Sequence, residues 1–102
     1  MNGRAPNKEE EVWLNRTKQI GCSPCIIAGR TKPFEVDGAY TANHHIDGQR
    51  KPGAHLLSFG CCAADHQHGA YSIHGNKKAF IDIYGTEVEV LEFTKKLVEE
   101  LF

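Results

Sequence analysis

The chain has 102 residues and nearly balanced charge, with 12 Lys and Arg against 13 Asp and Glu. A domain of this size buries only a small core, so a metal ion or a partner chain commonly supplements its stability. Balanced charge excludes a protein that holds nucleic acid by bulk positive charge, so such contacts would have to come from local patches. There is no apolar leader and no apolar run of membrane length, so we expect a cytoplasmic protein without membrane association.

The first predicted element is a helix over residues 8–20. Asn7 and Glu10 form a capping-box pattern at its start, and Gly21 is expected to end it. Trp13 is expected to lie over the small core.

A C-x-x-C pair, Cys22 and Cys25, follows this helix. In a reducing cytosol cysteines indicate metal ligands before disulfides, and two thiolates in a tight turn supply half of a tetrahedral zinc site. A redox C-x-x-C would need a strand before it and a helix after it, whereas here a helix precedes the pair and a loop-like stretch follows. The pair therefore predicts structural zinc.

A β-hairpin or a looser two-armed loop is predicted in the middle of the chain. Residues 34–46 look extended, with Gly38 as a bend, and residues 55–59 are expected to form the returning strand. All six histidines lie from His44 to His74, a clustering that core packing does not explain.

The other half of the zinc site is expected just after this hairpin, where a helical turn is predicted over 62–69. In a helix Cys62 and His66 are four residues apart and share a face. Because neighbouring residues cannot easily both reach one ion, Cys61 is the spare thiol, although an exchange of roles between Cys61 and Cys62 stays open. The predicted structural zinc ligands are Cys22, Cys25, Cys62 and His66.

Two more helices are predicted towards the end of the chain. The first covers 77–84 and ends at Gly85; the second opens with a capping box of Thr86 and Glu89 and runs to about residue 101. The apolar stripe of the second is expected to comprise Val88, Leu91, Leu97, Val98 and Leu101. No repeat or low-complexity tract is present, so we expect one domain over 1–102, with 1–6 as a flexible arm.

A set of short motifs follows in a fixed order along the chain: Gly21-Cys22-x-x-Cys25, His44-His45-Ile46, Gly53-x-His55, Cys62, the histidines before Gly69, Lys78-Ala79-Phe80 and Tyr84-Gly85-Thr86-Glu87. In this order, the motifs resemble the HNH endonucleases of the ββα-metal type, and more narrowly the RecA-dependent nucleases typified by the phage recombination-enhancement nuclease. The resemblance runs from about residue 8 to residue 92. Where that family shows Cys-x-x-His-His, this chain has Cys-Cys-Ala-Ala-Asp-His-Gln-His over 61–68.

The resemblance implies an α+β fold, a small zinc-stapled ββα-metal (HNH) motif flanked by an N-terminal helix and C-terminal helices. It also implies a DNA endonuclease in the cytoplasm of a bacterium or a phage-infected cell, acting in recombination or repair. Dependence on a RecA filament is implied by the resemblance alone.

Hydrolysis of a phosphodiester needs a base for water, a cation for the developing charge and a group that orients the base. His45 suits the base, because imidazole titrates near neutral pH. His44 and His68 suit a divalent cation, Mg²⁺ or Mn²⁺, although imidazoles also accept Zn²⁺ or Ni²⁺. His55 stands where the wider class carries an orienting Asn or His, so it is a catalytic residue in a supporting role.

Two questions about this site stay open. In a regular strand His44 and His45 point to opposite faces, so either the backbone twists or bulges there or the phosphate straddles the strand edge. The ligand of the catalytic cation that follows the hairpin is His68 in the leading interpretation, with His66 or His74 as alternatives.

Four basic residues are predicted to contact DNA phosphates, with ordinary solvated charges as the alternative interpretation: Arg50, Lys51, Lys77 and Lys78. The competing function is a non-catalytic, zinc-stabilised module that binds nucleic acid or protein. A disulfide-stapled secreted domain is disfavoured by the lack of a leader. The near-zero charge predicts weak intrinsic DNA affinity, and hence delivery by a partner or a DNA-bound oligomer.

Overall fold

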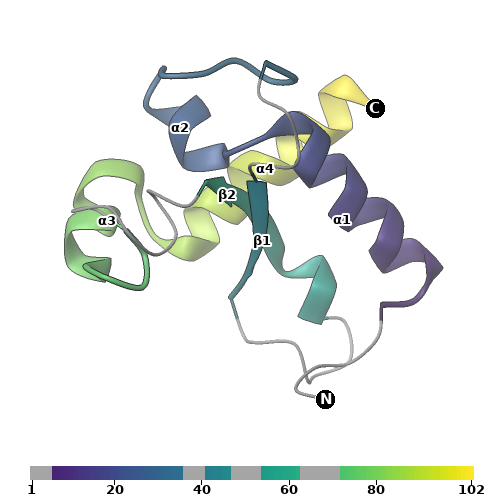
Figure 1. Cartoon of the computed structure of the whole chain (residues 1–102), viewed down its shortest axis with the longest axis horizontal. Helices are drawn as coiled ribbons and strands as arrows, with labels where there is room; N and C mark the ends of the chain where they lie inside the picture. Colours follow the sequence, from purple (N-terminus) through teal and green to yellow (C-terminus); the bar gives the residue numbers. More distant parts are fainter. Residues whose placement is uncertain (1–5, 36–40, 47–53, 63–71) are drawn as a thin grey trace.

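The computed structural model describes residues 6–35, 41–46, 54–62 and 72–102. It shows a small α+β fold in which helices lie around a two-stranded antiparallel sheet (Figure 1). Most of the arm expected over 1–6 lies outside the described residues. The elements in chain order are α1 (Lys8–Ile20), α2 (Ser23–Ile27), β1 (Thr41–His45), the 3-10 turn η2 (Ala54–Leu56), β2 (Ser58–Cys62), α3 (Lys77–Tyr84) and α4 (Glu87–Leu101).

Helix α1 begins and ends where the sequence predicts. The side chain of Asn7 accepts a hydrogen bond from the backbone N–H of Glu10 at 2.8 Å, and the Glu10 carboxylate accepts one from the N–H of Asn7 at 2.9 Å. Gly21 ends the helix with φ 107°, a conformation that side chains with a Cβ rarely adopt. The half-buried Trp13 packs against the core, as predicted, and its Nε1 donates to the carbonyl oxygen of Ser58 at 2.9 Å.

The predicted hairpin is confirmed, but its second strand lies later than expected. Strand β2 covers 58–62 rather than 55–59, because His55 lies in the 3-10 turn that precedes it. Cys62 therefore ends a strand instead of starting a helix, and the helical turn predicted after it falls on residues outside the described ones. The pairing is one to one from Thr41 opposite Cys62 to His45 opposite Ser58, so no bulge interrupts it.

The two faces of this sheet are covered by different helices. On one face, α1 packs so closely that Gly60 lies against the backbone carbonyls of Thr17 and Gly21. The amide of Asn43 on the same face donates to the Thr17 hydroxyl at 2.8 Å. On the other face, the apolar core joins the sheet to α3, α4 and the turn before α3. That core contains Phe59, Cys61, Ile73, Phe80, Tyr84, Val90 and Leu91.

The C-terminal helices are confirmed, with one correction to the buried face of α4. Thr86 and Glu89 form the predicted capping box, and Gly85 ends α3. Val88 is 58% exposed and Leu101 40% exposed, so neither belongs to the buried stripe that was predicted to include them. The buried face of α4 is rotated relative to the predicted one, away from Val88. The side chains that α4 buries are those of Val90, Leu91, Thr94 and Val98.

Two local predictions between α1 and β1 are wrong. The Cys22–Cys25 segment is not a simple turn, because Pro24 in the first turn of α2 favours a short helix with Cys22 as its N-cap. Phe34 is not extended but lies in a turn with φ 65°. Among the described residues, no helix has the length and apolar character needed to cross a membrane.

The contact at Gly60 generates a prediction about stability. In Gly60→Ala the new methyl group would lie 2.9 Å from the Thr17 carbonyl oxygen and closer still to that of Gly21, and neither backbone group can move without shifting α1. We expect the free energy of unfolding in urea to fall by about 1–3 kcal/mol or more. Ala42→Ser, at an exposed position of the paired strand, is the control and should change it by less than about 0.5 kcal/mol. Equal stability of the two variants would contradict the close packing of α1 on β2.

Candidate metal and histidine sites

Three cysteines come together where α2 meets the end of β2. Their sulfurs lie within 4.8 Å of one another, and the Sγ atoms of Cys25 and Cys62 are 3.7 Å apart. Cys22 is the N-cap of α2, where its sulfur accepts a hydrogen bond from the Cys25 N–H at 3.4 Å. Three sulfurs at this spacing could hold one metal ion.

The geometry favours Cys62 over Cys61 as the third ligand. Cys61 is outside this group of three and is fully buried on the opposite face of β2, within the apolar core. The contact with Cys25 lowers the pKa of the Cys22 thiol, but the neighbouring Cys61 thiol and burial outweigh it, so this pKa lies well above its usual value. A bound cation would reverse that balance by favouring the thiolate. The predicted fourth ligand, His66, lies outside the described residues.

Arg30 links the cysteine cluster to α3, a role that the sequence analysis did not assign. Its Nη2 lies 3.7 Å from the Cys25 sulfur and also donates to the Tyr84 hydroxyl, and its guanidinium carbon lies 5.3 Å from the centre of the Tyr84 ring. If the thiolates bind a metal, a guanidinium here would offset part of their negative charge.

His44 is buried against the helices on the core face of the sheet. Its Nε2 lies 2.6 Å from Oε2 of Glu87, and the other oxygen of Glu87 lies 2.6 Å from the Lys77 ammonium. The ring packs on Phe59, its partner across the strands, with centroids 5.3 Å apart, and meets the ring of His74 edge on at 5.1 Å. One carboxylate thus fastens β1 to the start of both α3 and α4.

The electrostatics of this contact favour a neutral imidazole beside a charged carboxylate. Burial lowers the pKa of His44 and outweighs the opposing effect of Glu87. Burial alone would raise the pKa of Glu87, but its hydrogen bonds with Lys77 and His44 hold it below the usual value. Near neutral pH, His44 therefore donates one N–H to a carboxylate that can only accept.

His45 faces the other way and pairs with His55. Nε2 of His45 lies 2.9 Å from Nδ1 of His55, and the rings meet edge to face with centroids 4.9 Å apart. His55 is buried and His45 half-buried. Burial and the nearby His55 lower the pKa of His45, which keeps it neutral and able to accept a proton near pH 7.

The two adjacent histidines thus serve opposite faces of a regular strand. The unbroken pairing of β1 excludes the bulge that was one way to bring them together. A twist of the strand, or a phosphate that straddles its edge, stays as a way for both rings to reach one phosphate.

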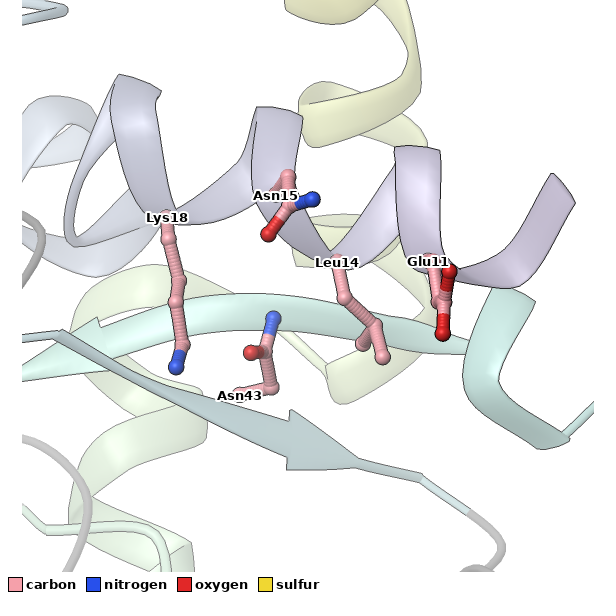
Figure 2. A pocket seen from close by; sticks show the side chains of 5 residues that line it. All are labelled: Glu11, Leu14, Asn15, Lys18 and Asn43. Carbon is pink, nitrogen blue, oxygen red and sulfur yellow. The ribbon is translucent and has the colours of Figure 1, made fainter. Parts of the chain in front are cut away.

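A polar cleft of about 340 Å³ lies between α1 and β1, on the same side of the sheet as His45. In Figure 2 the side chain of Lys18 extends from α1 down towards β1, and Asn43 points up from β1 towards the helix. Asn43 precedes His45 by two residues, so both side chains leave the same face of the strand. The cleft therefore places an ammonium and an amide on the face of the sheet that carries His45.

The predicted DNA contacts divide into described and undescribed residues. Lys77 and Lys78 are exposed at the start of α3, and the ammonium of Lys77 is already paired with Glu87. Arg50, Lys51 and His68 lie outside the described residues. Glu87 was missed, because an acidic residue at the start of a helix is ordinarily a favourable partner for the helix dipole.

The cysteine geometry generates a prediction about metal content. Cys62→Ser should lose the tightly bound metal, because it removes one of three sulfurs that face one another, whereas Cys61→Ala should keep it. Metal per chain is measured by elemental analysis after exhaustive dialysis. Metal loss from Cys61→Ala with retention in Cys62→Ser would show that the two cysteines have exchanged roles.

Comparison with known proteins gives the family. Residues 6–99 match the family model described as recombination enhancement, RecA-dependent nuclease. No match to the chain was found among curated proteins. The matched segment contains the cysteine cluster, both histidine sites and the described helices apart from the last two residues of α4. The chain belongs to the family of recombination-enhancement, RecA-dependent nucleases.

Proposed function

We propose that this protein is a metal-dependent endonuclease of the HNH type that hydrolyses DNA phosphodiester bonds in recombination, on DNA presented by a RecA filament. The observation that carries the proposal is the His45–His55 pair, a half-buried imidazole aligned by a second, buried one, in a chain of a nuclease family. A ββα-metal motif would combine the observed hairpin with a helix after β2, on residues outside the described ones.

His45 is the proposed general base. Its ring is half-buried at the end of β1, and His55 fixes the orientation of the ring through the hydrogen bond between Nε2 and Nδ1. A neutral His45 accepts the proton of the attacking water, and the contact with His55 holds the ring while it becomes charged.

His44 is proposed as a ligand of the catalytic cation, together with His68. A buried, neutral imidazole suits that task, since only the uncharged ring offers a lone pair to a metal. Mg²⁺ or Mn²⁺ bound there would stabilise the charge on the phosphate and on the leaving 3′ oxygen. The structural ion is proposed to be zinc, because three sulfurs match its preferred donors.

Recognition of DNA is proposed to depend on the partner more than on charge. The net charge of −1 gives no bulk attraction to DNA, and Lys77 is already paired with Glu87. The proposed phosphate contacts are Lys78, the cleft residue Lys18, Arg50 and Lys51. Such an enzyme would bind bare DNA weakly and act where a RecA filament brings the strand to it.

Nicking of DNA tests the proposed base. With Mg²⁺ or Mn²⁺ and RecA-coated single strand plus ATP, the protein should nick plasmid DNA, and His45→Ala should reduce the rate by about 10²–10⁴-fold. A parallel reaction without RecA measures the dependence on the filament. Glu92→Gln, at an exposed position of α4, is the control and should keep the parental rate.

The outcomes separate the alternatives. Equal rates for the parent and His45→Ala would remove His45 as the base. Absence of cleavage with every metal, with or without RecA, would favour the non-catalytic, zinc-stabilised module that binds nucleic acid or protein.

Removal of metals should distinguish the two proposed ions. Exhaustive dialysis against buffer without metal should abolish nicking while about one zinc per chain remains, because thiolates hold zinc far more tightly than imidazoles hold Mg²⁺. Adding back Mg²⁺ should restore the rate. Retention of full activity after dialysis with loss of all zinc would contradict the proposal that zinc is structural and that Mg²⁺ is catalytic.

A further inference from the structure

We propose that Glu87 is a positioning residue that fixes the tautomer of His44, so that this ring binds the catalytic cation through Nδ1. The inference rests on the proposed function, which makes His44 a ligand of that cation. It starts from the contact of 2.6 Å between Nε2 of His44 and Oε2 of Glu87.

The chemistry of the two groups determines which nitrogen carries the hydrogen. An ionised carboxylate only accepts hydrogen bonds, so Nε2 of His44 must be the donor. A neutral imidazole has one N–H, and its lone pair then lies on Nδ1. One nitrogen cannot both donate to Glu87 and bind a metal, so coordination by His44 uses Nδ1.

Glu87 is itself held in place. It is the first residue of α4, where the helix dipole favours a negative charge, and its side chain is only 12% exposed. Lys77 from α3 binds the oxygen that His44 does not use. With both oxygens engaged, the carboxylate has a fixed orientation.

The surroundings favour a supporting role for Glu87 over direct coordination. Of the residues that the structure describes, only the three cysteines form a group of three donors at metal-binding distances, so His44, His74 and Glu87 do not. Lys77 also places a positive charge 2.6 Å from the carboxylate. Phe59 and His74 pack against the His44 ring, which sets its plane while Glu87 sets its tautomer.

Nitrogen NMR of the imidazoles tests the assignment directly. Protein labelled with ¹⁵N on histidine, with its thiolate site already loaded, is recorded before and after addition of Zn²⁺ as a diamagnetic probe of the second site. We expect Nε2 of His44 to stay protonated in both spectra and the signal of Nδ1 to shift on binding. Loss of the Nε2 hydrogen when Zn²⁺ binds would overturn the proposal.

A variant supplies a second measurement. Glu87→Ala should weaken Zn²⁺ binding at the second site by about 10–100-fold in calorimetry, and should leave His44 as a mixture of tautomers. Glu92→Gln on the same helix should change neither quantity. Unchanged affinity and tautomer in a folded Glu87→Ala would also overturn the proposal; if that variant does not fold, the wild-type spectra decide.

The test is independent of nuclease activity. A protein that binds Zn²⁺ through Nδ1 of His44 but never cleaves DNA would refute the proposed function and leave the role of Glu87 intact. A protein that cleaves DNA but binds metal through Nε2 of His44 would support the proposed function and refute the role of Glu87.

Discussion

A two-stranded sheet cannot stand alone in water, and this requirement governs the fold. Side chains leave β1 and β2 alternately on two faces, and each face needs a cover. Helix α1 covers one and meets the backbone at Gly60, while α3 and α4 cover the other around Phe59. Two neighbouring residues of β1 therefore enter two chemically different environments.

That division explains why the two histidines are suited to different tasks. His44 enters the core face, where it is buried and contacts one oxygen of the Glu87 carboxylate, whose other oxygen pairs with Lys77. His45 leaves on the α1 face, at the end of the strand, where the imidazole of His55 contacts it, and a polar cleft lies on the same face. The ring of His44 is held rigidly and therefore suits metal binding. The ring of His45 is half-buried and neutral and therefore suits proton transfer.

The sequence predicted those parts of the structure whose signals are local. The caps of α1 and α4 lie within four residues of the helix starts, and both helices have the predicted bounds because side chain and backbone satisfy each other there. Strand β2 starts later than predicted because His55 lies in a 3-10 turn, and β-propensity does not reveal such a turn. The spacing favoured Cys62 over Cys61, and Cys62 lies with Cys22 and Cys25, although it ends a strand instead of starting a helix.

Contacts between distant segments were beyond sequence reasoning. Glu87 lies 43 residues from His44, and Arg30 lies 54 residues from Tyr84, so neither partner could be found by periodicity or spacing. The near-neutral charge predicts weak affinity for bare DNA, which stays a prediction; the ion pair of Lys77 with Glu87 is a further contact that the sequence did not reveal. The family match covers residues 6–99, and the resemblance drawn from the order of the motifs covers about 8–92, so the two agree in family and in extent.

The one-to-one pairing of β1 with β2 also has a genetic consequence. A shift of β1 by a single residue would turn His44 towards α1 and His45 towards Glu87, exchanging the surroundings of the two rings without altering the composition of the site. Insertions or deletions of one residue in this strand should therefore be far more harmful than most substitutions at its exposed positions. The chemistry of the site depends on the parity of the residue count along the hairpin as much as on the identity of its side chains.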